Sequence, residues 1–370
     1  MERNHYNTPQ TDDVRIVEAS PLISPAILIQ ELPVSPQVAH VVHDAREDYR
    51  RILEGEDDRL AVIVGPCSIH DPEAAIKYGE RLADIRDKYS DALQLIMRVY
   101  FEKPRTTIGW KGLINDPFID GSYKVNTGLR MARGLLLRLA EMGVPAATEF
   151  LDVITPQYIC DLIAWGAIGA RTTESQVHRE LASGLSMPIG FKNGTSGSIQ
   201  IAVDGIVAAK HQHCFLAVNK IGVSAIVSTM GNPLCHLILR GSSQGPNFSS
   251  EHVAKAWATQ QKAGISNRIM IDCSHGNSHK KWHEQHLVAE DVARQLAAGE
   301  QHIGAVMIES NLFSGNQKCD PATRAGDDKK PPLQFGVSIT DACVGWDETL
   351  AILDTLAQGV RTRRQAAAKA

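Results

Sequence analysis

The sequence alternates between short runs of consecutive apolar residues and longer segments in which apolar residues recur every three or four positions. Consecutive apolar runs are typical of parallel strands covered on both faces, and the wider spacing is typical of amphipathic helices. The runs predict strands at 60–64, 93–100, 145–150, 167–170, 188–192, 236–240, 268–271 and 303–309. Because strand and helix then alternate about eight times, we expect an α/β fold, the (β/α)8 or TIM barrel.

Capping signals locate several of the helices. Asp is favoured as the N-cap of a helix and Pro as its first residue, so Asp71 followed by Pro72 predicts the start of a helix. A Leu-rich helix ends before Gly143, and Gly is common just past a helix end. Another helix is expected over 155–163. The arginines after Gly359 indicate the frayed cationic end of a final helix.

Two segments interrupt the strand–helix rhythm. Residues 1–58 precede the first strand and contain a predicted helix at about 40–53. A β-hairpin at about 212–230 is inserted between the fifth and sixth barrel strands. We therefore expect an N-terminal arm and helix over 1–58, with a role in oligomer formation and regulation, and a catalytic barrel over 59–370. A polar loop is expected at 315–336.

Composition excludes several classes of protein. The 370 residues are 43% apolar and 22% charged, which is sufficient for a substantial core. Basic residues number 38 against 42 acidic ones, so nucleic-acid binding is not expected. No apolar run approaches the roughly 18 residues of a membrane span, and no signal peptide is visible, which predicts a cytoplasmic protein with no membrane partner. The seven scattered cysteines argue against a disulfide framework.

Polar residues end or follow all eight predicted strands. In barrels of this kind the carboxyl ends of the strands carry the functional side chains. The residues at these ends are Cys67, Arg98, Glu149, Arg171, Lys192, Arg240, His275 and Glu309. They predict a single pocket with cations, carboxylates, a thiol and an imidazole.

The cations of this pocket, joined by Lys103 and Arg105, suit two phosphorylated ligands. Guanidinium groups bind phosphate bidentately, and lysine adds a point charge. The alternative is that each cation pairs with an acid at the surface. Convergence of six cations on one face disfavours that alternative, because so much like charge requires anionic ligands.

A second set of residues suits a metal ion. Cys67, His275 and Glu309 end strands that are neighbours where the barrel closes, and Asp341 follows the last strand closely enough to fold over it. Thiolate, imidazole and carboxylate ligands together favour Mn, Fe, Co or Zn. The alternative is inert packing of the cysteine and a satisfied core histidine. Another histidine group has helical spacing, but its Lys and Glu neighbours favour a solvated face: His279, His283 and His286.

Long motifs at these positions resemble one family. The motifs are GPCSIHDP at 65–72, RVYFEKPRTT at 98–107, GWKGLINDP at 109–117, GARTTESQ at 169–176, GFKNGT at 190–195 and DCSHGNS at 272–278. In these motifs and over nearly its whole length, the sequence resembles the 3-deoxy-D-arabino-heptulosonate 7-phosphate synthases of class I, the bacterial and fungal type. The resemblance implies that phosphoenolpyruvate and D-erythrose 4-phosphate condense to this product and phosphate, the first step of the shikimate pathway to aromatic amino acids.

The resemblance also implies roles for individual residues. It implies a divalent metal ion with the ligands Cys67, His275, Glu309 and Asp341. The implied phosphoenolpyruvate site comprises Arg98, Lys103, Glu149, Gly169, Ala170, Arg171, Lys192 and Arg240. The implied erythrose 4-phosphate site comprises Pro104, Arg105 and Thr106. The implied catalytic residues are Lys103, Cys67 and His275, and either Lys103 or a metal-bound water is the general acid.

An aromatic amino acid effector and a homodimer or homotetramer are implied as well. In the resembled family the effector binds between the inserted hairpin and the N-terminal arm of the adjacent chain. The corresponding residues are Asp12, Asp13, Pro156, Gln157, Leu181, Leu185, Ser186, Phe215, Ala217 and Val227. Segments 149–152 and 165–167 are similar to those of Phe- or Trp-controlled members of the family, and of these two effectors we favour Phe. The alternative is an ordinary subunit interface without a ligand.

Two other functions compete with this one. A 3-deoxy-octulosonate 8-phosphate synthase shares the phosphoenolpyruvate chemistry, but such enzymes lack the N-terminal arm and the inserted hairpin. The other is a non-catalytic barrel that only binds phosphorylated metabolites. In such a barrel we would expect at least one strand to end without a chemically functional residue. All eight ends are chemically competent here.

Overall fold

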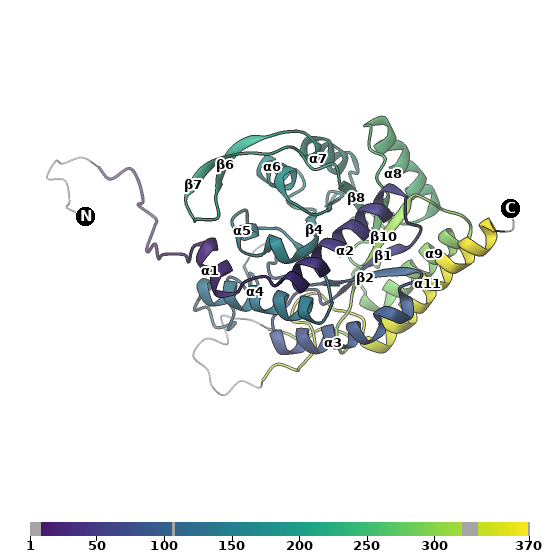
Figure 1. The fold of residues 1–370 in the computed structure, drawn as a ribbon, viewed down its shortest axis with the longest axis horizontal. Coiled ribbons are helices and arrows are strands. Elements are labelled where there is room, and N and C mark those ends of the chain that lie inside the picture. The colour runs from purple at the N-terminus through teal and green to yellow at the C-terminus, as the bar shows by residue number, and fades with distance from the viewer. Residues whose placement is uncertain (1–8, 106–107, 320–331, 369–370) are drawn as a thin grey trace.

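A computed structural model of the chain describes residues 9–105, 108–319 and 332–368. At its centre is a closed barrel of parallel strands in the order β1-β10-β9-β8-β5-β4-β3-β2 (Figure 1). These strands are Leu60–Gly65 (β1), Leu93–Arg98 (β2), Ala146–Glu149 (β3), Ile163–Ile168 (β4), Ile189–Lys192 (β5), Cys235–Leu239 (β8), Ile269–Asp272 (β9) and Ile303–Glu309 (β10). The predicted (β/α)8 barrel is confirmed.

Two helices precede the first strand, and the helices that follow the strands cover the outside of the barrel (Figure 1). They are α1 (Pro25–Glu31), α2 (Pro36–Glu54), α3 (Pro72–Tyr89), α4 (Val125–Glu141), α5 (Pro156–Ile159), α6 (Gln176–Gly184), α7 (Gln200–Lys210), α8 (Ser250–Lys262), α9 (Gln285–Ala297) and α11 (Trp346–Ala367). Two 3₁₀ turns are η1 (Cys160–Leu162) and η2 (Trp282–Glu284). In the part of the chain that the structure describes, none of these helices is both long and apolar enough to cross a bilayer.

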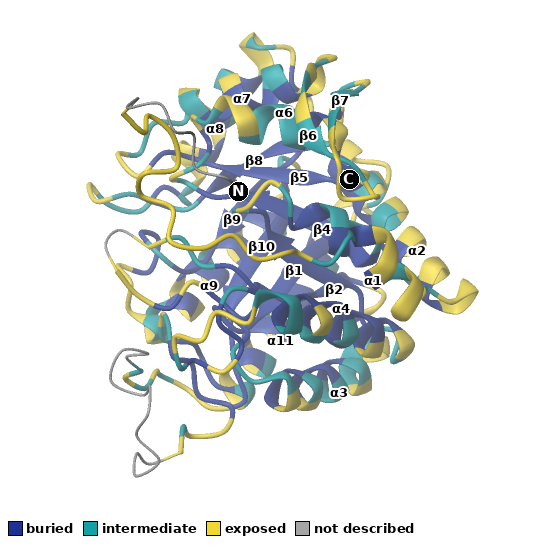
Figure 2. Cartoon of the chain, turned by 90° about the vertical axis from the view of Figure 1, so that its left-hand side faces the viewer, coloured by how far each residue is buried: buried dark blue, intermediate teal, exposed yellow. Residues whose placement is uncertain are grey.

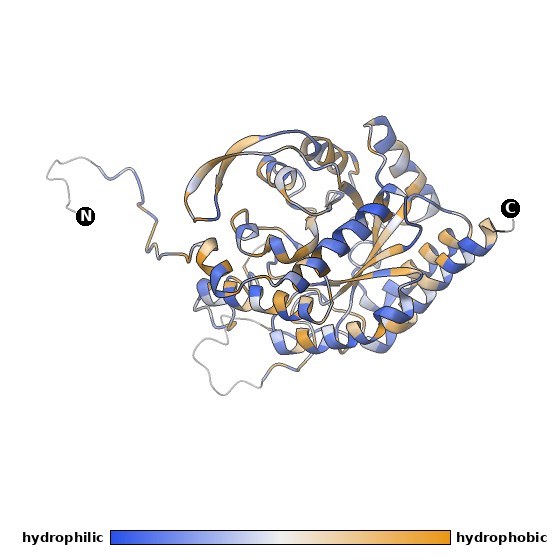
Figure 3. Ribbon diagram, in the orientation of Figure 1, coloured by the Kyte–Doolittle hydropathy of each residue, from blue (hydrophilic) through white to orange (hydrophobic). Residues whose placement is uncertain are grey.

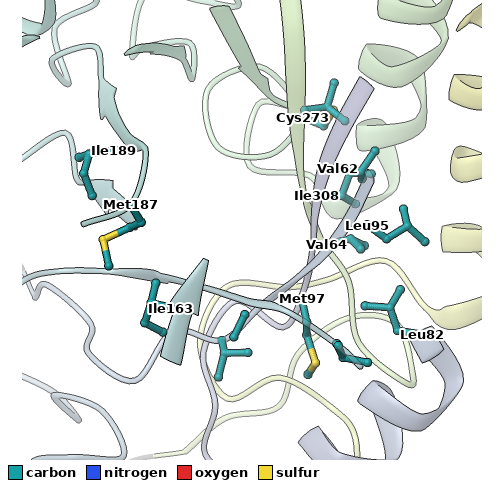
Figure 4. Packing of buried hydrophobic residues seen from close by; sticks show 14 of the residues in the cluster. Val62, Val64, Leu82, Leu95, Met97, Ile163, Met187, Ile189, Cys273 and Ile308 are labelled. Carbon is teal, nitrogen blue, oxygen red and sulfur yellow. The ribbon is translucent and has the colours of Figure 1, made fainter. Parts of the chain in front are cut away.

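Two apolar layers stabilise the barrel, one on each face of its strands. Val62 of β1 packs in the outer layer with helix residues, whereas its neighbour Ile63 belongs to the inner cluster. Figure 4 shows part of the outer layer, where Leu82 of α3 lies near the strand residue Leu95. Every residue of β1, β2 and β10 is buried, and Figure 3 shows the barrel strands as largely hydrophobic. Continuous apolar runs thus became strands because both of their faces are covered.

Helix α2 closes the amino-terminal end of the barrel. Its residues Tyr49, Ile52 and Leu53 join the inner apolar cluster. The Tyr49 hydroxyl lies 3.0 Å from His236 Nε2, and burial lowers the pKa of that imidazole to about 4. The amino-terminal end of the barrel is therefore filled by apolar side chains and a neutral imidazole. The charged residues of the barrel strands lie at the carboxyl end.

The predicted capping signals are confirmed. The Asp71 carboxylate accepts hydrogen bonds from the backbone N–H groups of Glu73 and Ala74, at 2.9 and 3.2 Å, so that α3 begins at Pro72. After α4, Gly143 has a φ of 74°, the left-handed region in which glycine meets no Cβ penalty.

The segment around β4 differs from the prediction. The expected helix over 155–163 is only the short α5 and η1, and the strand begins at Ile163 rather than at 167. Periodicity alone does not separate a buried strand from a buried helix in so apolar a run. Tertiary pairing decides here, because Gly166 lies opposite Ile189 of β5 and a Cβ at Gly166 would come within 2.7 Å of that side chain.

The inserted hairpin is confirmed between β5 and β8. Its strands, Cys214–Val218 (β6) and Ser224–Ser228 (β7), pair antiparallel and form a separate small sheet. In Figure 1 the hairpin curves outside the barrel, beyond α5 and α6.

The N-terminal arm has two parts. Residues 9–22 are exposed, and Figure 2 shows much of this stretch on the outside of the molecule. From Pro21 onward the chain is attached to its own barrel: Asn126 Nδ2 donates to the Pro21 carbonyl at 3.1 Å, the Tyr158 hydroxyl donates to the Ile23 carbonyl at 2.5 Å, and Leu28 of α1 is fully buried. The division at 58/59 stays a prediction.

The carboxyl-terminal helix corrects one expectation. α11 continues through Ala367, and its arginines are paired rather than frayed: Arg361 with Asp91 at 2.7 Å and Arg364 with Asp58 at 2.6 Å. Sequence order does not reveal these acids, which lie near the starts of β1 and β2. Most of the predicted polar loop, residues 320–331, lies outside the described residues.

Candidate active site

The eight predicted strand-end residues all lie at the carboxyl end of the barrel, each on its strand or within three residues of its end. A cavity of about 730 Å³ is found there. Its lining includes Arg171, Arg240, His275, Glu309 and Asp341. The other predicted strand-end residues are buried side chains: Cys67, Arg98, Glu149 and Lys192.

Three of the four implied metal ligands form one cluster. Ligand atoms of Cys67, Glu309 and Asp341 all lie within 4.8 Å of one another. His275 lies beside this cluster, with its Nε2 3.9 Å from Glu309 Oε1. The pairing of β1 with β10 sets Gly65 opposite Glu309, and Cys67 follows two residues later. The donor set of sulfur, carboxylate oxygen and imidazole nitrogen fits a divalent transition metal ion.

The electrostatics of this cluster also fit a cation. Burial raises the pKa of the Cys67 thiol and Glu309 raises it further, while Lys103 opposes both. Burial also raises the pKa of Asp341, but Lys103 and His275 outweigh it, so this pKa is lowered. The carboxylate therefore carries negative charge beside a thiol. A divalent cation held here would neutralise that charge and deprotonate a coordinating thiol.

Two of the predicted cations are buried and paired with acids. Arg98, with 1% of its surface exposed, places Nη2 3.0 Å from Glu309 Oε1. Lys192, with 3% exposed, places Nζ 3.2 Å from Asp272 Oδ2. A buried charge requires such a partner. Here Glu309 is itself part of the candidate metal cluster, and Asp272 contacts His275 beside it.

Two other cations face the cavity. Arg171 and Arg240 both contribute to its lining. Arg171 Nη1 donates to the Pro104 carbonyl at 2.8 Å, which joins the β4 end to the loop after β2. Among the described residues no acid forms an ion pair with Arg240, so the alternative of surface ion pairs does not hold for this side chain.

The loop after β2 carries the implied aldose phosphate residues. Lys103 Nζ lies 3.2 Å from Cys67 Sγ, and Arg105 Nε donates to the Trp110 carbonyl at 2.7 Å. A glycine is required beneath this loop, because a Cβ at Gly112 would lie 1.9 Å from the Phe101 carbonyl oxygen and the φ is 122°. Of the implied set Pro104, Arg105 and Thr106, the last lies outside the described residues.

Gly169 and Ala170 follow β4 next to Glu149. A Cβ at Gly169 would come within 2.3 Å of Glu149 Oε1. The absence of a side chain therefore lets the main chain approach this buried carboxylate, and the structure brings these three implied residues together.

The implied effector residues divide into two groups. Eight of them line a second cavity, of about 980 Å³, between the hairpin and α5–α6: Pro156, Gln157, Leu181, Leu185, Ser186, Phe215, Ala217 and Val227. Asp12 and Asp13 are exposed residues of the arm and are not part of this lining.

Sequence reasoning gave no role to two buried acids near the site. Asp272, fully buried at the end of β9, contacts both Lys192 and His275. Asp272 belongs to the motif DCSHGNS, but sequence spacing does not show which acid a distant cation contacts. Glu102, next to Lys103, has 4% of its surface exposed and accepts a hydrogen bond from the Thr155 hydroxyl at 3.3 Å.

A barrel with cations, carboxylates and a thiol at its carboxyl end is typical of an α/β-barrel enzyme that acts on anionic substrates. Comparison with known proteins specifies the family. The model of the DAHP synthetase I family matches residues 31–354, and the chain belongs to this family.

Individual relatives agree with this assignment. The chain is 55% identical over 355 residues to a phospho-2-dehydro-3-deoxyheptonate aldolase, Phe-sensitive, of Escherichia coli, covering 96% of this chain and 99% of the relative. It is 50% identical over 360 residues to a tyrosine-inhibited enzyme of the same name from Schizosaccharomyces pombe, covering 97% and 96%. A solved structure of the Francisella tularensis aldolase superposes with a TM-score of 0.90 at 52% identity, covering 94% of this chain and 99% of that one. The family and the activity expected from the sequence, 3-deoxy-D-arabino-heptulosonate 7-phosphate synthesis in the shikimate pathway, are confirmed.

Proposed function

We propose that this protein catalyses a metal-dependent condensation of phosphoenolpyruvate with D-erythrose 4-phosphate at the carboxyl end of its barrel. The observation that carries the proposal is the cluster of Cys67, Glu309 and Asp341, whose ligand atoms lie within 4.8 Å of one another. Those three residues and His275 would hold the ion. When bound, it would polarise the aldehyde carbonyl as a Lewis acid. Mn, Fe, Co and Zn all suit this donor set.

Phosphoenolpyruvate is proposed to bind through the cations beside this cluster. Arg171 and Arg240 line the cavity, and with Lys192 they bind the phosphate. Arg98 and Lys103 bind the carboxylate. Both lie beside the cluster, at 3.0 Å from Glu309 and 3.2 Å from Cys67 respectively. Glu149, Gly169 and Ala170 form the adjoining wall.

Erythrose 4-phosphate is proposed to bind along Pro104, Arg105 and Thr106. C3 of phosphoenolpyruvate attacks the aldehyde carbon, a water molecule adds at C2, and phosphate leaves with cleavage of the C–O bond. Lys103 is the proposed proton donor to the former aldehyde oxygen, because its Nζ lies within 3.2 Å of the Cys67 sulfur.

Regulation is proposed to occur at the hairpin cavity. Its apolar walls suit an aromatic ring, and Asp12 and Asp13 from a neighbouring chain would meet the ammonium group of the effector. This arrangement requires a homodimer or homotetramer. Phe is the favoured effector. Relatives named for sensitivity to Phe, Tyr and Trp are 55%, 50% and 51% identical to this chain, so overall identity does not separate the three effectors. We also propose a cytoplasmic location.

Phosphate release from the purified protein tests the main proposal. Release is expected only with both substrates and an added divalent metal ion, and a chelator should abolish it. Arabinose 5-phosphate in place of erythrose 4-phosphate should give little release, and preference for the pentose would instead support the octulosonate reaction. Full activity in metal-depleted buffer after chelation would contradict metal dependence. The same assay with Phe, Tyr or Trp identifies the effector.

A further inference from the structure

The buried acid Asp272 joins the two halves of the candidate site. Its Oδ2 lies 2.9 Å from His275 Nδ1 and 3.2 Å from Lys192 Nζ. Its Oδ1 accepts hydrogen bonds from the backbone N–H and the hydroxyl of Ser274, at 3.0 and 2.7 Å. Each carboxylate oxygen therefore has its own set of partners, which fixes the orientation of the group.

These contacts select one tautomer of His275. Nδ1 makes its hydrogen bond with the Ser274 hydroxyl, 2.7 Å away, while Asp272 Oδ2 contacts it at ion-pair distance. The Ser274 hydroxyl uses its own hydrogen on Asp272 Oδ1, so it can only accept from Nδ1. Nδ1 must therefore carry the proton, and Asp272 sets this arrangement through Ser274. The Nε2 lone pair is then free on the side of Glu309, 3.9 Å away.

The backbone at this point is also constrained. His275 has a φ of 56°, a conformation that a residue with a Cβ rarely adopts. The Asp272 carbonyl accepts a hydrogen bond from Asn277 Nδ2 at 2.8 Å, and its carboxylate binds Ser274. Both ends of Asp272 thus hold the turn that presents His275. Such outliers persist where the surroundings over-determine them, often at functional sites.

We propose that Asp272 is a positioning residue that sets the His275 tautomer for metal binding and orients Lys192 toward the phosphate of phosphoenolpyruvate. A second carboxylate partner of a metal-binding histidine is a general device for fixing ring and tautomer. Here the same oxygen also contacts a substrate-binding lysine. The inference rests on the proposed function for the identity of both ligands, but the tautomer does not depend on it.

The variant Asp272→Asn tests this proposal most directly, because it replaces one acceptor oxygen with a donor and changes little else. The two Ser274 donors hold the amide oxygen at the Oδ1 position, so the amide NH₂ faces His275 Nδ1 and Lys192 Nζ. A donor there stabilises the opposite tautomer, with the proton on Nε2, and repels the lysine. We expect affinity for Co²⁺ alone to fall about 10- to 100-fold, with a weakened thiolate-to-cobalt absorption band. The KM for phosphoenolpyruvate should rise on the Co²⁺-loaded enzyme.

Asp116→Asn is the matched control, since Asp116 is a buried acid outside the site that accepts a hydrogen bond from the Gly121 N–H at 3.2 Å. It should keep wild-type Co²⁺ affinity. Wild-type Co²⁺ affinity and KM in Asp272→Asn would overturn the proposal.

A measurement on the unmodified protein applies even if Asp272→Asn fails to fold. The ¹⁵N shifts of His275, assigned with His275→Gln, report which ring nitrogen carries the proton in the metal-free chain. Protonated Nδ1 is expected, and protonated Nε2 would overturn the proposal. Failure of the wild-type protein to bind Co²⁺ would instead contradict the proposed function, while the ¹⁵N result would still decide the role of Asp272.

Discussion

The ammonium group of Lys103 lies 3.2 Å from the sulfur of Cys67. This contact connects the loop after β2, where the aldose phosphate is proposed to bind, to the candidate metal cluster at the end of β1. Because a cation lies beside the thiol, loss of either side chain changes the environment of the other. Variants in this region therefore need separate readouts for metal binding and for substrate binding.

Removal of a metal ligand should abolish activity without unfolding the protein. Cys67→Ala and His275→Ala are expected to lose turnover and bound metal, since each removes one donor from the cluster. Metal content by mass spectrometry and the thermal midpoint check this expectation. Cys235→Ala, which removes a buried thiol of β8 outside the site, is the control and should keep its metal. Near-normal turnover and metal content in either ligand variant would show that the ligand set is wrong.

Removal of a phosphate-binding cation should affect phosphoenolpyruvate and not the metal. Lys192→Ala and Arg171→Ala each remove a charge-assisted contact of about 1.5–3 kcal/mol. Their kcat/KM for phosphoenolpyruvate should fall roughly 10- to 150-fold, as steady-state kinetics would measure. Metal affinity should change much less. Lys255→Ala, on the exposed face of α8, should behave as wild type. Unchanged phosphoenolpyruvate kinetics in both variants would argue against the phosphate site.

The strand ends could be predicted because they depend only on local patterns. A buried parallel strand is a continuous apolar run, and the residue that ends it, such as Lys192 or Glu309, follows directly in the sequence. Asp341, Lys103 and Arg105 joined these groups from their place in the sequence, and the resemblance then added Gly169, Ala170, Pro104 and Thr106. The start of β4 was not predictable from the run itself, since the pairing of Gly166 with β5 decides it. The Asp272–Lys192 contact joins two separate parts of the chain, and the Arg364–Asp58 pair joins the last helix to the segment before β1, so only the folded barrel reveals them.

Glu102 should make stability depend on pH. Burial and the nearby Asp152 raise the pKa of Glu102 to about 8, whereas an unfolded glutamic acid titrates near about 4.3. Between these two values the folded protein keeps a proton that the unfolded chain releases. The free energy of unfolding should therefore fall as pH rises through this window, by up to a few kcal/mol.

Urea denaturation from pH 5 to pH 8 (about the window between these pKa values) measures this effect. Glu102→Gln should flatten the profile and be relatively more stable at the alkaline end. Glu141→Gln, at the exposed end of α4, should retain the wild-type profile. Identical slopes for wild type and Glu102→Gln would contradict the assignment.

Deletion of residues 1–20 should relieve feedback inhibition and leave catalysis intact. The described part of this segment, residues 9–20, is exposed. The attachment of the arm to its own barrel begins later, at Pro21 and Ile23, so α1 should stay in place. Phosphate release at increasing effector concentration measures the result. The double variant Asp12→Asn with Asp13→Asn tests the carboxylates alone and should require more effector. A truncated enzyme inhibited at the same concentration would refute the role of the arm.

The cluster of Cys67 with Glu309 and Asp341 straddles the seam where the first barrel strand pairs with the last. The site is therefore also a marker of completed folding. A nascent chain that has not yet emerged beyond β10 holds Cys67 without its carboxylate partners. In refolding, helices and neighbouring strands depend on short-range contacts, whereas this seam depends on the longest-range strand pairing of the barrel, which forms slowly. Catalytic competence should consequently return later than helical content, and partly closed barrels should have no activity at all.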